Sequence, residues 1–259
     1  MTRPALFDTH LHIIDPAHPL VENNGYLPDP FTAADYLARV ADLNVVGGAV
    51  VSGSFQAFDQ GYLRDALTAL NQEGRRFVGV TQIPASTTDA EILDLDAAGV
   101  KAVRFNLKRG GSAGLDDLAD LARRVHDLAG WHTELYVDAR ELPELEPTLV
   151  SLPAVSIDHL GMHRDGTPAL LRLVERGVKV KATGFGRVEL DPAEVIGQIM
   201  AIDPTALMVG TDLPSTRAKR PFEDADLDLI AQAVTDAVGE EYVDAVFRTN
   251  AEAFSLLLP

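Results

Sequence analysis

Two histidines separated by one residue, His10 and His12, stand near the start of the chain in the run Phe-Asp-Thr-His-Leu-His. In an extended strand, alternate side chains point to one face and lie about 6.6 Å apart at Cα. Two imidazoles at that spacing can bind one metal ion or act on one polarised oxygen atom. The pair can equally be two polar residues at a solvated strand end, so the rest of the chain must decide.

Two further groups of the same chemical kind follow apolar runs later in the chain. His159 comes after Val155–Ile157, and Asp212 comes after Leu207–Val209. In a barrel of parallel strands, the carboxyl ends of all strands meet at one rim, where enzymes of this architecture keep their catalytic residues. We therefore expect His10, His12, His159 and Asp212 to converge on one reaction centre.

The elements that must position these groups are short apolar, β-branched runs that alternate with segments of helical spacing. Eight runs separated by helices predict an α/β fold, a (β/α)₈ barrel of the TIM type. An open, doubly wound sheet is the alternative, and no Gly-rich phosphate fingerprint supports it; Gly47 and Gly48 are better explained by tight packing inside a strand. The predicted strands are Ala5–Phe7, Val45–Val51, Phe77–Gln82, Ala102–Phe105, Thr133–Val137, Val155–Ile157, Val178–Lys181 and Leu207–Val209. Helices are predicted at Ala33–Leu43, Tyr62–Glu73, Asp89–Ala98, Leu115–Ala129 and Pro168–Arg176.

Composition limits the class of protein and its partners. The 259 residues, 46% of them hydrophobic, suit one barrel domain spanning residues 1–259. The net charge of −17 argues against nucleic acid and against anionic membranes, but not against a small anionic substrate held by local arginines. The absence of cysteine excludes disulfides and thiol catalysis. Together with the lack of a signal peptide or of an 18-residue apolar stretch, it predicts a cytoplasmic protein. The sequence leaves both a monomer and a homo-oligomer open.

The longest irregular segment, Asp15–Pro30, follows the first predicted strand and is rich in Pro and Asn. In a barrel it would rise over the carboxyl-terminal face. We expect it to cover the substrate.

Four motifs together resemble the amidohydrolase superfamily. They are Asp-Thr-His-Leu-His at 8–12, Ile-Asp-His-Leu-Gly at 157–161, Val-Gly-Thr-Asp-Leu-Pro at 209–214 and Asn-Ala-Glu-Ala-Phe at 250–254. The resemblance runs over essentially the whole chain and is narrower to the branch that contains 2-pyrone-4,6-dicarboxylate lactonase and sugar-acid lactonases. It implies a distorted barrel in which His10, His12, His159 and Asp212 surround the reacting carbonyl.

The resemblance also bears on the metal. In the metal-rich branches a lysine or another ligand ends the fourth strand and a histidine ends the fifth, whereas this chain has Asn106 and either Tyr136 or Asp138. A two-metal centre is therefore not expected, and some members of the lactonase branch work without metal. We expect at most one divalent ion and favour zinc. Its ligands would be drawn from His10, His12, His159 and Asp212.

Substrate-binding candidates follow from the same resemblance. Arg104, Arg109 and Arg187 match basic positions of that branch, and guanidinium groups suit planar carboxylates. Arg104 could instead pair with a barrel carboxylate, and Arg109 could simply face solvent. The other candidates are Tyr26 and Ser54 in the pocket wall and, less strongly, His163 at the same rim. Leu213 and Ser215 depart from the tryptophan and histidine of the lactonase branch, so the identity of the substrate is not carried over.

The leading hypothesis is hydrolysis of a carboxylated lactone or related cyclic ester. Asp212 would take a proton from water, and the three histidines, directly or through an ion, would polarise the carbonyl. A metal-dependent decarboxylase of an aromatic or unsaturated acid is the alternative, because such enzymes share the early histidine pair, the middle histidine and the late aspartate. A binding protein on the same barrel is a third reading, although none of the four central groups is missing.

Overall fold

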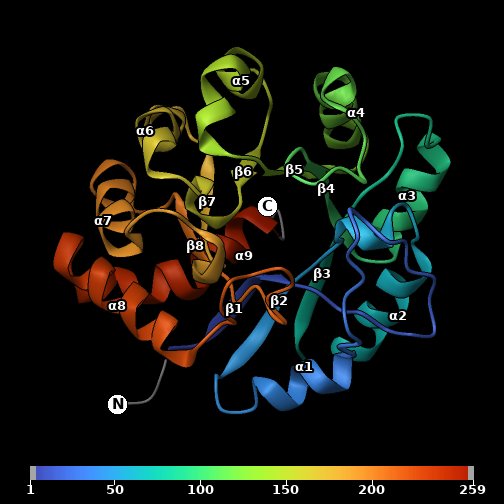
Figure 1. Cartoon of the computed structure of the whole chain (residues 1–259), viewed down its shortest axis with the longest axis horizontal. Helices are drawn as coiled ribbons and strands as arrows, with labels where there is room; N and C mark the ends of the chain where they lie inside the picture. The colour runs from blue at the N-terminus through green and yellow to red at the C-terminus, as the bar shows by residue number, and fades with distance from the viewer. Residues whose placement is uncertain (1–3, 256–259) are drawn as a thin grey trace.

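A computed structural model describes residues 4–255 of the chain, so the ends of the expected domain, 1–3 and 256–259, lie outside the described residues. Eight strands form one sheet in the order β1 to β8, and every neighbouring pair is parallel. The sheet curls into a nearly closed barrel with helices around it, which confirms the predicted TIM-type fold (Figure 1). The strands are β1 Leu6–Leu11, β2 Val45–Val51, β3 Arg76–Thr81, β4 Val100–Asn106, β5 His132–Tyr136, β6 Val155–Ile157, β7 Lys179–Ala182 and β8 Leu207–Val209.

The five predicted helices are present with small shifts at their ends. Four further helices of the described residues, α5, α7, α8 and α9, were not predicted. Helix α5 is short and contains Pro147, and α7 begins after the capping carboxylate of Asp191 without a marked change in the sequence pattern. Within residues 4–255, no helix combines the length and apolar character that a bilayer crossing requires. The helices are α1 Ala33–Arg39, α2 Gly61–Leu70, α3 Asp89–Ala97, α4 Leu118–Ala129, α5 Leu142–Leu149, α6 Thr167–Glu175, α7 Pro192–Ile202, α8 Asp224–Val238 and α9 Asn250–Ser255.

Glycines in β2 permit close contact between neighbouring strands. A Cβ atom on Gly47 would lie 2.3 Å from the carbonyl oxygen of Arg76, and one on Gly48 would lie 2.4 Å from the carbonyl oxygen of Asp8. Both distances are too short for a side chain. The prediction that these glycines serve barrel packing is confirmed.

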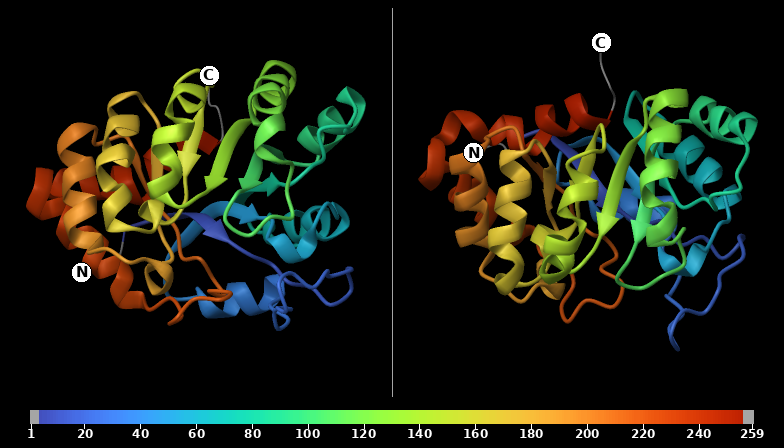
Figure 2. Two further views of the ribbon diagram at one scale, coloured as in Figure 1. Left: turned by 45° about the horizontal axis from the view of Figure 1, so that its top comes forward. Right: turned by 90° about the horizontal axis from the view of Figure 1, so that it is seen from above.

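The two ends of the barrel are built differently. The loop at residues 12–30 and the loop after β8 lie at the end toward which the strands point, as Figure 2 shows. At the opposite end, α9 covers the barrel floor, where Phe254 packs on the ring of His132 with centroids 4.4 Å apart. The expectation that the long loop reaches the mouth is confirmed by hydrogen bonds from Asn23 to Arg109 and from Arg217 to Asn23.

The barrel closes between β8 and β1 without a continuous strand ladder. Individual hydrogen bonds join this seam instead. The Thr9 hydroxyl donates to the carbonyl of Val209 at 2.9 Å, the Asp212 amide donates to the carbonyl of His10 at 2.7 Å, and the His12 amide donates to the carbonyl of Leu213 at 2.8 Å. The closing contacts therefore lie at the residues predicted to carry the chemistry.

Asp8 ties the same seam together from inside. Its buried carboxylate accepts hydrogen bonds from the Thr211 amide at 2.8 Å, the Thr211 hydroxyl at 2.7 Å, the Tyr36 hydroxyl at 2.9 Å and the His10 amide at 3.2 Å. Burial raises the pKa of Asp8, and these hydrogen bonds oppose that rise. One side chain thus connects β1, α1 and the loop that carries Asp212.

We predict that Asp8→Ala lowers the free energy of unfolding by about 3 kcal/mol, because several buried donors lose their acceptor at once. Urea unfolding of the variant and the parent protein checks this. Asp116→Ala, at an exposed aspartate, is the control and should change the value by less than about 0.5 kcal/mol. Equal stability of Asp8→Ala and Asp116→Ala would contradict the role given to Asp8.

Candidate active site

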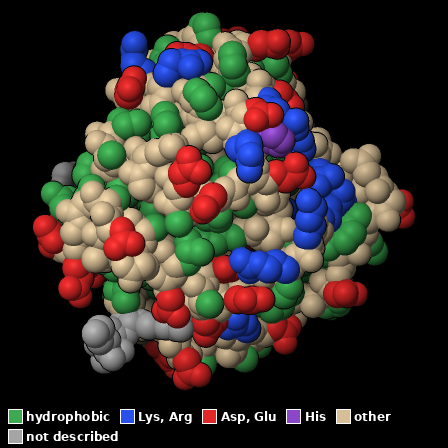
Figure 3. Space-filling model, turned by 60° about the vertical axis from the view of Figure 1, so that its left-hand side comes forward, with side chains coloured by type: hydrophobic (Ala, Val, Ile, Leu, Met, Phe, Trp, Pro, Cys, Tyr) green, Lys and Arg blue, Asp and Glu red, His purple; other side chains and the backbone are tan. Residues whose placement is uncertain are grey.

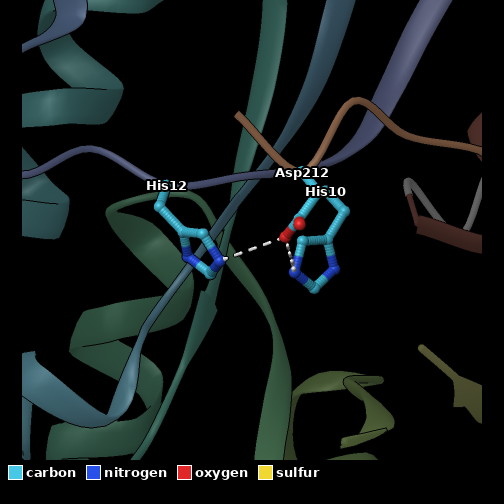
Figure 4. A group of neighbouring side chains, drawn as sticks. All are labelled: His10, His12 and Asp212. Carbon is cyan, nitrogen blue, oxygen red and sulfur yellow. Dashed lines mark ion pairs between the residues drawn. The ribbon is translucent and has the colours of Figure 1, made fainter. Parts of the chain in front are cut away.

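His10, His12 and Asp212 come together at the seam (Figure 4). His10 and His12 belong to β1 and its end, and Asp212 follows β8. The Nε2 atoms of His10 and His12 lie 3.8 and 3.7 Å from the same oxygen, Oδ1 of Asp212. All three side chains are buried, so the predicted convergence of these groups is present in the fold.

The groups on the far side of each ring indicate which nitrogen faces Asp212 as a lone pair. Nδ1 of His12 lies 2.7 Å from the carbonyl oxygen of Val51, which can only accept, so this nitrogen carries the proton. Nδ1 of His10 faces the Asp158 carboxylate at 3.3 Å, which favours the same tautomer. In their neutral forms both histidines therefore present an Nε2 lone pair to Asp212 Oδ1, an arrangement that suits a bound cation or a water molecule that donates hydrogen bonds.

His159, the third predicted histidine, is held in strained backbone beside this pair. It has a φ of +54°, and its ring centroid lies 4.8 Å from that of His10 and 5.1 Å from that of Tyr136. A Cβ atom on Gly184 would lie 2.5 Å from Nδ1 of His159, so only glycine fits there. Positive φ at a buried, non-glycine residue is typical of functional sites.

Burial keeps His10 and His159 neutral. It lowers the pKa of His10 to about 4, against the opposing attraction of Asp158, and lowers the pKa of His159 well below its ordinary value. Neutral imidazoles can bind a metal ion or exchange hydrogen bonds with water and substrate.

Asp212 has one committed oxygen and one free oxygen. Nε of Arg187 donates to Oδ2 at 2.9 Å, whereas Oδ1 has no hydrogen-bond donor among the described residues. Asp212 has a φ of +60°, and its pKa is well below the usual range because the positive charge of Arg187 outweighs the desolvation that would raise it. The arrangement leaves Oδ1 as an ionised acceptor. Arg187, which was predicted to bind substrate, is therefore paired with Asp212, the candidate general base.

Asp158 is a site residue that sequence reasoning did not select. Its carboxylate accepts a hydrogen bond from Arg104 at 2.8 Å, faces His10, and lies 3.8 Å from Nζ of Lys181. Lys181 in turn donates to Glu134 at 2.5 Å. Arg104 also donates to the carbonyl of Ser52 at 2.8 Å, so it makes the structural pairing that was the alternative to ligand binding. The signal in the sequence that could have identified Asp158 is its position directly before His159.

A cleft made of two adjoining chambers, which share several lining residues, lies beside His12 and His159. The inner chamber, of about 30 Å³, is lined by His12, His159, Ser54, Arg104 and other residues. The outer chamber, of about 190 Å³, reaches the rim. The residues that line both chambers are Arg109, Tyr136, Arg187 and Arg217.

The rim of the cleft is rich in cations although the chain is acidic overall. Lys108, Arg140 and Lys219 join the shared arginines in the outer chamber. Figure 3 shows one face of the molecule, on which Lys and Arg side chains gather beside a histidine while Asp and Glu side chains are scattered. Such a mouth raises the local concentration of anions.

Several other candidates lie at this rim rather than at the histidines. Asp138 pairs with Arg140 at 2.7 Å and Lys108 at 3.0 Å, so it is not available as the ligand considered for the fifth strand. His163 faces Asp165 and Glu189 at 3.6 Å each. Tyr26 lies behind Arg217 and is not among the residues that line the two chambers.

A family model described as amidohydrolase matches residues 7–254, nearly all of the chain. The chain belongs to the amidohydrolase family. This finding confirms the predicted family and, with it, the prediction of an enzyme rather than a binding protein.

Two curated relatives and one solved structure extend the comparison. A 2-pyrone-4,6-dicarboxylate hydrolase of Comamonas testosteroni is 31% identical over 159 residues, which are 60% of this amidohydrolase chain and 51%, about half, of the relative. A 4-sulfomuconolactone hydrolase of Rhizobium radiobacter is 29% identical over 258 residues, covering 89% of this chain and 84% of the relative. An apo structure from Agrobacterium tumefaciens superposes with a TM-score of 0.84 at 22% identity, covering 100% of this chain and 98% of the other, and shares the fold.

Amidohydrolases often hold a divalent metal, and the residues present here fit one ion. His10, His12 and Asp212 offer ligand atoms within 4.8 Å of one another, as do His10, Asp158 and His159. Both groups need His10, and the Asp158 carboxylate is already engaged by Arg104. The two groups therefore cannot each hold an ion through His10 at the same time. The group with Asp158 is the weaker candidate metal site, because Arg104 already occupies its carboxylate.

Burial of His10 has a consequence for acid stability. The pKa of an unfolded histidine is about 6.5, and that of His10 in the fold is about 4, so between these values the unfolded state binds more protons. The free energy of unfolding therefore decreases as the pH falls from about 6.5 toward 4. The share of His10 in the decrease from pH 7 to pH 5 is about 2 kcal/mol.

We predict that His10→Asn, which cannot be protonated, shows a smaller decrease than the parent protein. Urea unfolding of both proteins at pH 7 and pH 5 measures the difference. His18→Asn is the control, because His18 lies in the long loop and pairs with an exposed aspartate, Asp65. Identical decreases in all three proteins would show that His10 is not held neutral by burial.

Proposed function

We propose that this amidohydrolase opens a carboxylated lactone or related cyclic ester by direct attack of water. The observation that carries the proposal is Oδ1 of Asp212, an ionised acceptor with no donor among the described residues, which lies 3.7 Å from Nε2 of His12. His12 lines the inner chamber of the cationic cleft together with His159, so the carboxylate lies just behind the wall of that chamber. The relatives named as lactone and pyrone hydrolases support the same reaction class.

In the proposed reaction, Asp212 Oδ1 accepts a proton from water while the Nε2 lone pair of His12 orients that water. The oxygen attacks the lactone carbonyl carbon, and the ring C–O bond breaks. The proton on Asp212 then passes to the departing ring oxygen, which yields an acid and a hydroxyl group. Arg187 keeps Asp212 ionised and oriented through Oδ2, so the free oxygen stays directed at the water.

Polarisation of the carbonyl falls to the groups on the other side of the inner chamber. His159 and Tyr136 line this chamber with Arg187, so a carbonyl bound there would have these three groups around its developing negative charge. A divalent ion, when bound, would add Lewis-acid polarisation and lower the pKa of the water.

For the metal, we infer at most one divalent ion, held by His10, His12 and Asp212 with His159 nearby, and favour zinc because imidazole ligands suit it. Elemental analysis of protein purified without added ions tests this. Two tightly held equivalents per chain would contradict it. If the purified protein contains no metal, polarisation of the carbonyl is the task of His159, Arg187 and Tyr136 alone.

We predict that Asp212→Asn reduces turnover of the substrate by at least about 10²-fold with little change in binding, because the amide cannot accept a proton. The substrate is first identified in a screen of 2-pyrone-4,6-dicarboxylate, 4-sulfomuconolactone and sugar-acid lactones. Turnover is measured as ring opening and as release of protons. Asp165→Asn, at the rim, is the matched control. Near-normal turnover in Asp212→Asn would remove the base from the mechanism. Release of carbon dioxide without ring opening would instead favour the decarboxylase.

A further inference from the structure

The cations around the cleft fall into two groups. Arg187 is paired with Asp212, Lys108 and Arg140 share Asp138, and Lys219 is paired with Glu189. Arg109 and Arg217 have no ion pair with any residue in the range 4–255. These two arginines line both chambers of the cleft.

The two unpaired arginines line the same chambers as neighbouring like charges. Burial lowers the pKa of Arg217, and the neighbouring charge of Arg109 lowers it further. Nε of Arg109 is buried and has no hydrogen-bond partner among the described residues. Two guanidinium groups placed together without a counter-ion repel each other, and an anion bound between them relieves that repulsion.

The long loop after β1 fixes Arg217 in this position. The guanidinium group donates to the carbonyl and side-chain oxygens of Asn23, the latter at 3.0 Å, and lies 4.4 Å above the ring of Tyr26. The amide of Asn23 donates to the carbonyl of Arg109 at 3.2 Å. Asn23 therefore connects both arginines. Arg217 also has a φ of +59°, a strained conformation that these contacts must maintain.

We propose that Arg217 is a specificity-determining residue, which with Arg109 binds a second anionic group of the substrate, a carboxylate or sulfonate remote from the reacting carbonyl. The inference rests on the proposed function for the position of the carbonyl, in the inner chamber next to Asp212. The arginines lie along the same cleft toward the rim. Asn23 acts as a positioning residue for this subsite, and the long loop contributes to selectivity rather than only covering the substrate.

A pair of unreactive ligands tests the subsite without any hydrolysis. Isophthalate carries two carboxylates and benzoate carries one, and neither contains a bond that a lactonase could open. Titration calorimetry should show that the parent protein binds isophthalate at least about 10-fold more tightly than benzoate. Arg217→Met should weaken isophthalate binding by at least about 10-fold and abolish most of this preference.

Matched variants separate geometry from charge. Lys219→Met removes one positive charge from the same rim, but from a lysine that is 77% exposed and paired with Glu189, and should keep the preference. Arg217→Lys keeps the charge without the planar fork and should give an intermediate preference. Asn23→Ala should weaken isophthalate binding and reduce the same preference. Far-ultraviolet circular dichroism and urea unfolding verify that each variant is folded.

The outcomes distinguish this proposal from the proposed function. Equal preference in the parent protein and Arg217→Met, or no binding of isophthalate by the parent protein, would overturn the subsite. A preference that depends on Arg217 in a protein that hydrolyses no lactone would uphold the subsite and reject the reaction. An equal loss in Lys219→Met and Arg217→Met would mean that only overall charge matters, and would also overturn the proposal.

Discussion

The contact on which the site depends is the buried carboxylate of Asp8. Among the described residues, no continuous ladder joins β8 to β1, and only a few backbone hydrogen bonds, at His10, His12 and the residues after β8, link the ends of these two strands. Asp8 adds to them by accepting hydrogen bonds from His10 on one side and Thr211 on the other, with Tyr36 as a third donor. The distance between the histidine pair and Asp212 is thus set by these few backbone contacts together with the side chain of Asp8.

Charge pairing around the histidines explains how so many ionised groups can be buried at one point. Arg187 pairs with Asp212, Arg104 with Asp158 and Lys181 with Glu134, all inside the barrel. Buried ion pairs recover their desolvation cost only with good geometry, and here each cation also fixes the orientation of its carboxylate. His10 and His159 remain neutral among these pairs. An anionic substrate meets the lysines and arginines of the rim, two of whose carboxylates, Asp138 and Glu189, are themselves paired with cations, before it reaches the groups around Asp212.

The site residues that the sequence predicted are those at strand ends, and the ones it missed depend on the conformation of loops. His10, His12, His159 and Asp212 lie at or just after strand ends, and a barrel brings strand ends to one rim whatever the loops do. The partnership of Arg187 with Asp212 and the position of Arg217 depend on loops with positive φ at Asp212 and Arg217, which no periodicity reveals. Asp8 lies inside a recognised motif, but its role requires knowledge that β8 returns beside β1.

The central claim is that Oδ1 of Asp212 accepts the proton of the attacking water. A crystal structure of Asp212→Asn in complex with the lactone that the parent protein hydrolyses would test it most directly, because this variant should bind the closed ring without opening it. The account predicts the lactone carbonyl carbon in the inner chamber, with a water molecule between it and the side chain at position 212, and the carboxylates near Arg109 and Arg217. A lactone held with its carbonyl directed away from position 212, or bound outside the cleft, would contradict the account.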